Sequence, residues 1–343
     1  MGYLISICIT SYKRIKELER CIKSVDSKYY DKVEIVVSED CSPQKEQIKE
    51  LVESLAESSP YKITFNTNIN NLGYDRNLKQ LQKLATGEYI FYLSDDDVIV
   101  PGALDKLIDH IEKNNQEDEL LFAPFWYGPI NDVRRKHEKS FKIEKGEKSA
   151  AKYVYDSILF SGLIFKKAAI FELDAERFKN LNYFQVYMFL HVMNKYGAYY
   201  LDEMMIDSVS DGENAYGQVD SSKSNQKDKR NEYLADRNSA FSNLEFNKGL
   251  FKAIKIFDED NKTEVFNEFS KEYSLRAFGG LCRARSFGMQ TYREYWKKMH
   301  ELDIHYTSVV TVYFIVLLIL GDKLGEMFFS IPRVLLRKLR KSK

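Results

Sequence analysis

The chain has 343 residues, and its 51 basic side chains (Lys or Arg) balance 51 acidic ones. A balanced charge provides no global field that would favour nucleic acid as a partner, so none is expected. The apolar fraction of 44% is ordinary for a packed globular protein. At about 150 residues per domain, the length predicts two structural units.

The N-terminal part predicts alternating strands and helices. Short apolar runs bounded by polar residues predict buried strands, and they occupy residues 4–9, 33–37, 61–65 and 89–93. Apolar side chains at helical spacing predict the helices between these strands, over residues 15–25, 48–55 and 75–85. Such alternation is typical of an α/β fold with a mainly parallel sheet and helices on both faces.

Polar clusters follow the first, second and fourth predicted strands. They cover residues 10–14, 39–42 and 94–97. In open α/β sheets, ligands bind outside the carboxyl ends of the strands. The three clusters are therefore expected to line one crevice.

The remainder of the chain has a weaker pattern. Strands are expected near 120–125 and 161–165, and a helix over 184–196. The sequence is interpreted as a catalytic domain over 1–210, a polar linker or mobile loop over 211–229, and a mostly helical extension. This extension divides into a helical region over 230–305 and an amphipathic basic tail over 306–343.

The cysteines and the N-terminus indicate a cytosolic chain. Cys8, Cys21, Cys41 and Cys282 form no CxxC pair and have no accompanying His cluster. We interpret them as reduced thiols and expect no zinc site. The opening segment lacks the features of a secretory signal. It matches the Met-Gly-x-x-x-Ser myristoylation pattern, but the same residues are the start of the first predicted strand.

Three adjacent carboxylates, Asp95 to Asp97, directly follow the apolar run 89–93. Such carboxylates repel one another, and a hard divalent cation such as Mn²⁺ or Mg²⁺ relieves the repulsion through oxygen ligands. The cation can also neutralise a departing diphosphate. The alternative is a solvated turn that caps a helix over 102–114.

The motifs around these clusters resemble those of family-2 glycosyltransferases, which have the GT-A fold. The matching segments are residues 9–14 (Ile-Thr-Ser-Tyr-Lys-Arg), 34–42 (Glu-Ile-Val-Val-Ser-Glu-Asp-Cys-Ser), 71–77 (Asn-Leu-Gly-Tyr-Asp-Arg-Asn) and 89–101 (Tyr-Ile-Phe-Tyr-Leu-Ser-Asp-Asp-Asp-Val-Ile-Val-Pro). The resemblance implies a GT-A (Rossmann-like) domain and an inverting glycosyltransferase of the bacterial surface-polysaccharide type. It covers residues 3–101 well and 120–205 loosely.

The resemblance also implies roles for the site residues. Asp40 would accept a hydrogen bond from a pyrimidine N3–H, which suits UDP, because a carboxylate needs a donor. Thr10 and Tyr12 would line the base and ribose pocket. Asp95 would lie near the ribose and the metal, and Arg76 would contact base or phosphate, or is a surface arginine. Asp96 and Asp97 are the metal candidates, and the choice between them stays open.

The sequence departs from the family at the general base. Family members carry an acidic residue about a dozen positions before a glycine, and here Gln185 and Val186 occupy that place before Gly197. Neither can accept a proton at neutral pH. Asp156, Asp174 and Glu176 are candidates by proximity in sequence alone. The gap keeps a second hypothesis open, a nucleotide-sugar-binding or scaffold protein of the same fold.

A nucleotidyltransferase is the third hypothesis. It requires a glycine-rich, basic phosphate loop after the first strand, and residues 10–14 contain no glycine.

The C-terminal tail combines apolar and basic residues. Residues 309–320 are nearly all apolar, but twelve helical residues rise only about 18 Å, against a bilayer core of roughly 30 Å. A second apolar stretch follows, mixed with Lys and Arg. This composition suits the surface of an anionic cytoplasmic leaflet. A peripheral enzyme with a saccharide or lipid-linked acceptor is therefore expected, and a buried helix or an oligomer contact remains the alternative.

Overall fold

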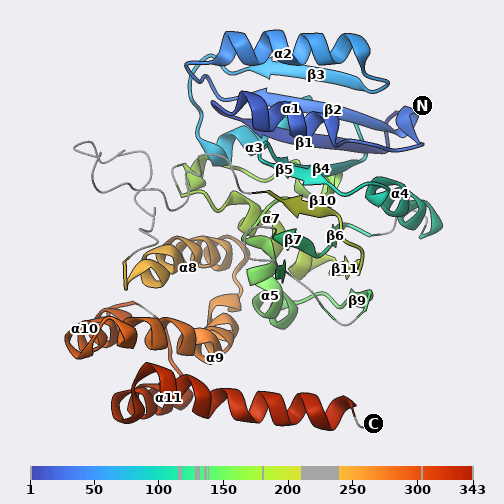
Figure 1. The fold of residues 1–343 in the computed structure, drawn as a ribbon. Coiled ribbons are helices and arrows are strands. Elements are labelled where there is room, and N and C mark those ends of the chain that lie inside the picture. The colour runs from blue at the N-terminus through green and yellow to red at the C-terminus, as the bar shows by residue number, and fades with distance from the viewer. Residues whose placement is uncertain are drawn as a thin grey trace.

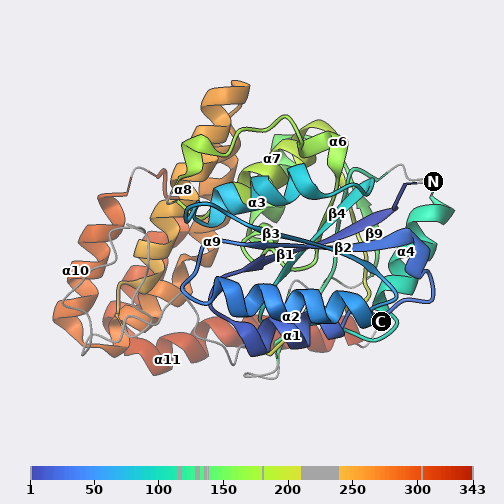
Figure 2. The same cartoon turned by 90° about the horizontal axis from the view of Figure 1, so that it is seen from above.

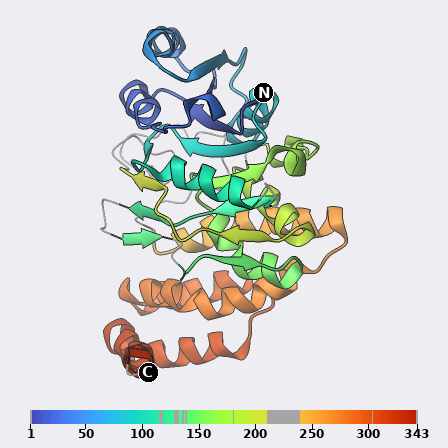
Figure 3. The same cartoon turned by 90° about the vertical axis from the view of Figure 1, so that its right-hand side faces the viewer.

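The computed structural model describes residues 2–114, 118–127, 132–134, 137, 139–179, 181–209, 239–302 and 304–341. Predicted linker residues 211–229 lie outside these ranges. The structure consists of an N-terminal α/β domain followed by stacked helices, with α2 and α11 at opposite ends (Figure 1 and Figure 3).

An eight-stranded mixed sheet forms the centre, in the order β3-β2-β1-β4-β10-β6-β11-β9. Its strands are β1 (Ile5–Ser11), β2 (Val33–Glu39), β3 (Lys62–Thr67), β4 (Tyr89–Ser94), β6 (Leu120–Phe122), β9 (Phe141–Ile143), β10 (Leu163–Lys166) and β11 (Ala198–Tyr200). Only β10 and β9 run against the other strands of this sheet. The predicted mainly parallel sheet is confirmed.

Helices cover both faces of the sheet, because its strands are apolar on both sides. They are α1 (Ile15–Lys23), α2 (Lys45–Ser58), α3 (Tyr74–Leu84), α4 (Ala103–Lys113), α5 (Glu147–Tyr153), α6 (Lys167–Ile170) and α7 (Phe184–Lys195), with the 3₁₀ turns η1 (Tyr30–Lys32), η3 (Val154–Ser157) and η4 (Glu176–Phe178). The α1, α2 and α4 side shares one core with β1 and β2 through residues such as Ile7, Ile35 and Leu104. On the opposite face, α3 and α7 pack around Leu81 and Met188 (Figure 2).

A second, four-stranded sheet in the order β5-β12-β7-β8 was not predicted. Its strands are β5 (Asp97–Ile99), β7 (Phe125–Tyr127), β8 (Asp132–Arg134) and β12 (Ile206–Ser208). Each has three residues, which is too short for a periodic pattern to reveal. The expected strand 120–125 is divided between the two sheets, as β6 and β7.

The C-terminal helices are α8 (Ser242–Asn261), α9 (Val265–Ser286), α10 (Met289–His300) and α11 (Ser308–Lys341). The first two join the core of the α/β domain, because Ile254 of α8 and Phe269 of α9 belong to the cluster around Met188 of α7. A separate cluster, which includes Leu281, Tyr292 and Leu317, holds α9, α10 and α11 together.

Candidate active site

The carboxyl ends of β1, β2 and β4 lie side by side at one edge of the large sheet. In β1, Ser11 pairs with Glu39 of β2, and Thr10 pairs with Ser94 of β4. The loops that leave these strands therefore begin next to one another, because parallel strands in register end together. The three polar clusters of the sequence thus form one edge of the molecule.

Arg14 connects the first cluster to the acidic triplet. Its Nη1 donates to Oδ1 of Asp95 at 2.7 Å and lies 3.2 Å from Oδ2 of Asp96. The backbone N–H of Tyr12 donates to the other oxygen of Asp95 at 3.4 Å. Burial raises the pKa of Asp95 to about 7, although Arg14 opposes the shift. A protein cation therefore relieves part of the repulsion within the triplet, a role that sequence reasoning assigned only to a metal.

Asp96 and Asp97 turn towards different partners. The hydroxyl of Ser94 donates to Asp96, and Arg20 Nη2 donates to the Asp96 carbonyl at 3.3 Å. The Asp97 carboxylate instead accepts from Ser161 Oγ at 2.5 Å. The Asp96 carboxylate therefore lies beside Asp95 and Arg14. Asp97 is the first residue of β5, and its carboxylate contacts Ser161, just before β10.

The acidic loop does not enclose a metal ion by itself. Among the residues that the structure describes, no three His, Cys, Asp or Glu side chains are arranged to hold an ion. Magnesium, however, is commonly bound by one or two carboxylates, with phosphates and water supplying the other ligands. The residues present fit that second kind of site, with Asp96 as the carboxylate and a diphosphate as the main ligand.

Asp40 lies in a cradle of N–H donors that the Asn-x-Gly turn supplies. Its Oδ1 accepts from Leu72 N at 2.7 Å and from Asn68 Nδ2 at 3.0 Å, and its Oδ2 accepts from Gly73 N at 2.9 Å. Gly73 has φ of 79°, a backbone region that favours glycine. Since each carboxylate oxygen has two lone pairs, Oδ2 can accept one further hydrogen bond.

The other predicted nucleotide-binding residues surround this cradle. Thr10 and Tyr12 are partly buried at the end of β1 and beyond it. Arg76 of α3 donates through Nε to the Leu72 carbonyl at 2.7 Å, and its Nη1 lies 4.0 Å from Glu176. Arg76 therefore braces the turn that holds Asp40.

Gln185, which takes the place of the expected base, is 2% exposed at the start of α7. Its Nε2 donates to the Ile158 carbonyl at 3.2 Å, while its buried Oε1 has no hydrogen-bond partner among the residues that the structure describes. The sequence drew attention to this position because it lacks the carboxylate that the family resemblance implies. In the structure, Gln185 Oε1 is a buried acceptor that none of the described groups donates to.

The three base candidates lie in two places. Asp156 is in η3, two residues before the carbonyl that Gln185 contacts, and its carboxylate lies 3.6 Å from His137 Nε2. Asp174 and Glu176 are exposed, and the Asp174 side chain accepts from Glu176 N at 3.0 Å, as in an ordinary turn. Asp156 is therefore the candidate next to Gln185.

Asp75 fixes the start of α7 from another helix. The helix has no capping side chain of its own. The buried Asp75 carboxylate, in the first turn of α3, accepts from Asn182 N at 2.8 Å and from Phe184 N at 2.9 Å. Burial raises its pKa to about 7, although these N–H groups oppose the shift. No pattern in the sequence predicts this contact, because the partners are more than a hundred residues apart.

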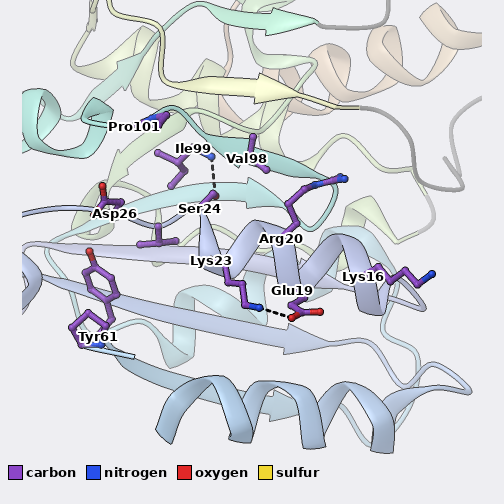
Figure 4. A pocket seen from close by; sticks show the side chains of 12 residues that line it. Lys16, Glu19, Arg20, Lys23, Ser24, Asp26, Tyr61, Val98, Ile99 and Pro101 are labelled. Carbon is purple, nitrogen blue, oxygen red and sulfur yellow. Dashed lines mark hydrogen bonds and ion pairs between the residues drawn. The ribbon is translucent and has the colours of Figure 1, made fainter. Parts of the chain in front are cut away.

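A surface hollow of about 950 Å³ lies on the α1 side and reaches Arg20, which donates to the Asp96 carbonyl (Figure 4). Charged side chains and apolar ones such as Val25 and Val98 line it together, and within it Lys23 pairs with Glu19 at 2.6 Å. Ile99 N donates to Ser24 Oγ at 3.0 Å across the hollow. None of the predicted site residues lines it. We therefore assign it no part in the site.

The fold and the loops at its carboxyl edge define a GT-A domain. The family model described as Glycosyl transferase family 2 matches residues 6–171. The crystal structure of S. aureus TarS in complex with UDP-GlcNAc has the same fold, with a TM-score of 0.56, 15% sequence identity, and coverage of 83% of this chain and 73% of that chain.

Curated relatives match over shorter segments. Abequosyltransferase RfbV of Salmonella typhimurium is 30% identical over 103 residues, which are 29% of this chain and 30% of RfbV. The GalNAc(5)-diNAcBac-PP-undecaprenol beta-1,3-glucosyltransferase of Campylobacter jejuni is 31% identical over 113 residues, or 30% of this chain and 33% of the relative. The chain thus spans about a third of the length of these relatives.

Proposed function

We propose that this chain is an inverting glycosyltransferase, which transfers a sugar from a pyrimidine nucleotide-sugar to a hydroxyl of a saccharide or lipid-linked saccharide. The donor would be a UDP-sugar, with a hexosyl or N-acetylhexosaminyl group, and the product a bacterial surface polysaccharide. The observation that carries the proposal is the meeting of the Asp40 cradle and the Asp95–Asp97 loop at one sheet edge. The names of RfbV, TarS and the Campylobacter relative agree with this class.

The donor would bind on the nucleotide side, which we define as residues 10–14, 39–42, 68–76 and 94–97. The open lone pair of Asp40 Oδ2 suits the N3–H of uracil, because the cradle already occupies the other acceptor positions. Thr10 and Tyr12 would line the base and ribose, and Asp95 would contact the ribose. Arg76 would act mainly by bracing the 71–73 turn.

A divalent cation, Mn²⁺ or Mg²⁺, would be held chiefly by Asp96 and would stabilise the charge on the departing diphosphate. Asp97 would contribute less, because its carboxylate is bound to Ser161 just before β10, whereas Ser94 and Arg14 keep the Asp96 carboxylate beside Asp95. Arg14 supports the same site by keeping Asp95 and Asp96 close together.

The acceptor would bind on the acceptor side, defined as residues 154–161 and the start of α7. Its hydroxyl oxygen would attack the anomeric carbon while the bond to the diphosphate breaks, so that the configuration inverts. Asp156 is our preferred base for the hydroxyl proton, and Gln185 Oε1 would accept a hydrogen bond that orients the acceptor. Asp174 and Glu176 are less suitable, because they lie in an exposed turn.

The second candidate is a nucleotide-sugar-binding protein without turnover, which the neutral Gln185 favours. Both candidates predict that UDP raises the melting temperature in the presence of Mn²⁺. Only the enzyme releases free UDP from a UDP-sugar at a rate that rises with acceptor and metal. A panel of UDP-sugars tested in both assays therefore separates them, and stabilisation without release would support the binding protein.

The enzyme would work at the cytoplasmic face of the plasma membrane, as a peripheral protein. Residues 306–343 are the part proposed to bring it there, and a lipid-linked acceptor would be presented at the same surface. The undecaprenol in the name of the Campylobacter relative is consistent with such an acceptor.

A further inference from the structure

Exposed apolar side chains of the described residues are concentrated near the C-terminus. Of the 14 large hydrophobic residues that are exposed, seven lie on α11, and these are Val312, Ile315, Ile319, Leu320, Leu324, Met327 and Phe328. Two more, Leu275 and Phe287, belong to α9 and its C-terminal cap. Single exposed apolar residues are normal on a protein surface, but a contiguous group indicates an interaction site.

The opposite face of α11 is already occupied. Val310 and Leu317 are buried in the cluster that includes Tyr292 and Met299 of α10. The Tyr292 hydroxyl donates to the Phe314 carbonyl at 2.9 Å. The helix therefore lies along the helical layer at the end of the molecule (Figure 1). By helical spacing, exposed side chains such as Ile315 and Ile319 lie on the side opposite Val310 and Leu317.

The geometry of α11 opposes a membrane-spanning role, although its first part passes the composition test for one. Residues Ser308–Phe329 have a mean hydropathy of 1.8 and are 17% buried. The helix is interrupted at Gly321, where φ is 76° and ψ is −176°. The 13 residues before the break span about 20 Å, well short of the roughly 30 Å bilayer core.

The break is held in place by α9. A helix that stops at Gly321 leaves its last carbonyls without intrahelical partners, and Arg285 Nε donates to one of them, Leu317 O, at 3.1 Å. Cys282 Sγ contacts the Asp322 carbonyl on the other side of the break at 3.7 Å. The interruption therefore belongs to the packed structure.

Charge indicates what covers the exposed face. Residues 308–343 contain seven Lys or Arg and two Asp or Glu, a formal charge of +5 (7 − 2) in a chain whose net charge is zero. A segment that combines exposed apolar side chains with a sequence excess of basic residues, six of them at 333–343, fits the boundary between acyl chains and anionic headgroups. An apolar protein partner would account for the exposed apolar side chains but not for the excess of basic residues.

We propose that the exposed face of α11, on both sides of Gly321, docks flat on an anionic phospholipid leaflet without crossing it. The inference rests on the membrane location proposed above and specifies the surface and its orientation. It does not depend on the chemistry at the carboxyl edge. Turnover with a soluble acceptor therefore serves as an independent readout.

The test compares the full chain with Ile319→Asp/Leu324→Asp, which changes two side chains that are 73% and 59% exposed. Sedimentation is measured with phosphatidylcholine vesicles, with and without phosphatidylglycerol. We expect the wild type to bind only the anionic vesicles and to be released by high salt, and the variant to bind about tenfold more weakly or worse. Tyr30→Asp, at a site that is 57% exposed on η1, is the matched control and should bind as the wild type does.

Three results would overturn the proposal. The wild type could fail to sediment with anionic vesicles, or the double variant could bind as well as the wild type. Resistance to high salt and alkaline carbonate would instead indicate a spanning helix. Light scattering is measured on the same samples, because a wild-type dimer that the variant converts to a monomer, without vesicle binding, would assign this face to a second copy of the chain.

Discussion

Two carboxylates on the nucleotide side and one amide on the acceptor side are buried but differ in their hydrogen bonds. Asp40 accepts from Leu72 N, Gly73 N and Asn68 Nδ2, and Asp95 accepts from Arg14 and from Tyr12 N. The neutral Gln185 keeps a buried oxygen that has no partner among the described residues. A saturated carboxylate is held in a fixed position, whereas an open acceptor is costly unless a ligand completes it.

This difference indicates that the two sides contribute differently to the proposed reaction. The Asp40 and Asp95 carboxylates are held in place before the donor arrives, so they and their neighbours should affect donor binding and diphosphate departure. The acceptor side is completed only by its ligand, so its residues should affect turnover with little effect on nucleotide affinity. The predictions below test this division.

The largest effect is expected from Asp96→Ala. Loss of the proposed metal ligand should lower metal-dependent turnover by about a thousandfold, because charge on the departing diphosphate would lose its main stabilisation. UDP release from the UDP-sugar, measured against Mn²⁺ concentration, checks this. Asp97→Ala is the matched comparison and should cost less, since Asp97 contacts Ser161 just before β10, whereas Arg14 holds Asp96 beside Asp95. Equal losses in both variants would contradict the assignment of Asp96 as the main ligand.

Asp156→Asn tests the acceptor side. Removal of a general base should lower kcat by about a hundredfold, while the affinity for UDP stays unchanged. Asp174→Asn, in the exposed turn, is the control and should leave both quantities near the wild-type values. If the two variants behave alike in steady-state kinetics, Asp156 is not the base.

Asp40→Asn tests the donor cradle with almost no change of shape. The amide replaces one oxygen by an NH2 donor, which must face either Leu72 N and Asn68 Nδ2 or Gly73 N and the pyrimidine N3–H, and all of these groups are donors. We expect UDP affinity to fall about tenfold by calorimetry, with a smaller effect on kcat at saturating donor. A variant that binds UDP as tightly as the wild type would remove Asp40 from the base pocket.

Part of the fold and of the site can be predicted from the sequence, because it depends on short stretches of the chain. Apolar runs such as 33–37 and 89–93 mark buried strands, and residues that directly follow parallel strands must meet at one edge. The position of Asp40 and of the acidic triplet follows from that rule. The mainly parallel sheet is recoverable in the same way, whereas the three-residue strands β5 and β12 carry too little pattern.

The contacts that tune the site depend on distant packing and could not be predicted. Arg14 and Asp95 are separated by 81 residues, and their ion pair depends on the directions of two loops. Asp75 meets Phe184 across 109 residues, and a single carboxylate in a helix gives no sign of such a partner. The end of the first apolar run at residue 320 is visible in the sequence, but the positive φ at Gly321 and its contacts with α9 are visible only in the structure.

Of these variants, Asp75→Asn should have the smallest effect on turnover and the clearest effect on how the free energy of unfolding depends on pH. Burial raises its pKa from 3.8 to about 7, so between these pH values the folded protein holds a proton that the unfolded chain has released. Unfolding then releases a proton, and raising the pH across this window lowers the free energy of unfolding, by a few kcal/mol at most. Asp95 has a similarly raised pKa, so Asp75→Asn should remove about half of this slope in denaturant unfolding at a series of pH values.

The same variant tests whether Asp75 links the two sides. An amide at this position can accept from only one of Asn182 N and Phe184 N, which loosens the start of α7 and the position of Gln185. We expect kcat to fall by about threefold while UDP affinity is unchanged. The exposed Asp31→Asn should keep both the pH slope and the kcat of the wild type. If Asp75→Asn instead weakens UDP binding as much as it lowers kcat, Asp75 supports the whole domain. In that case Asp75 of α3 does not act on the acceptor side alone.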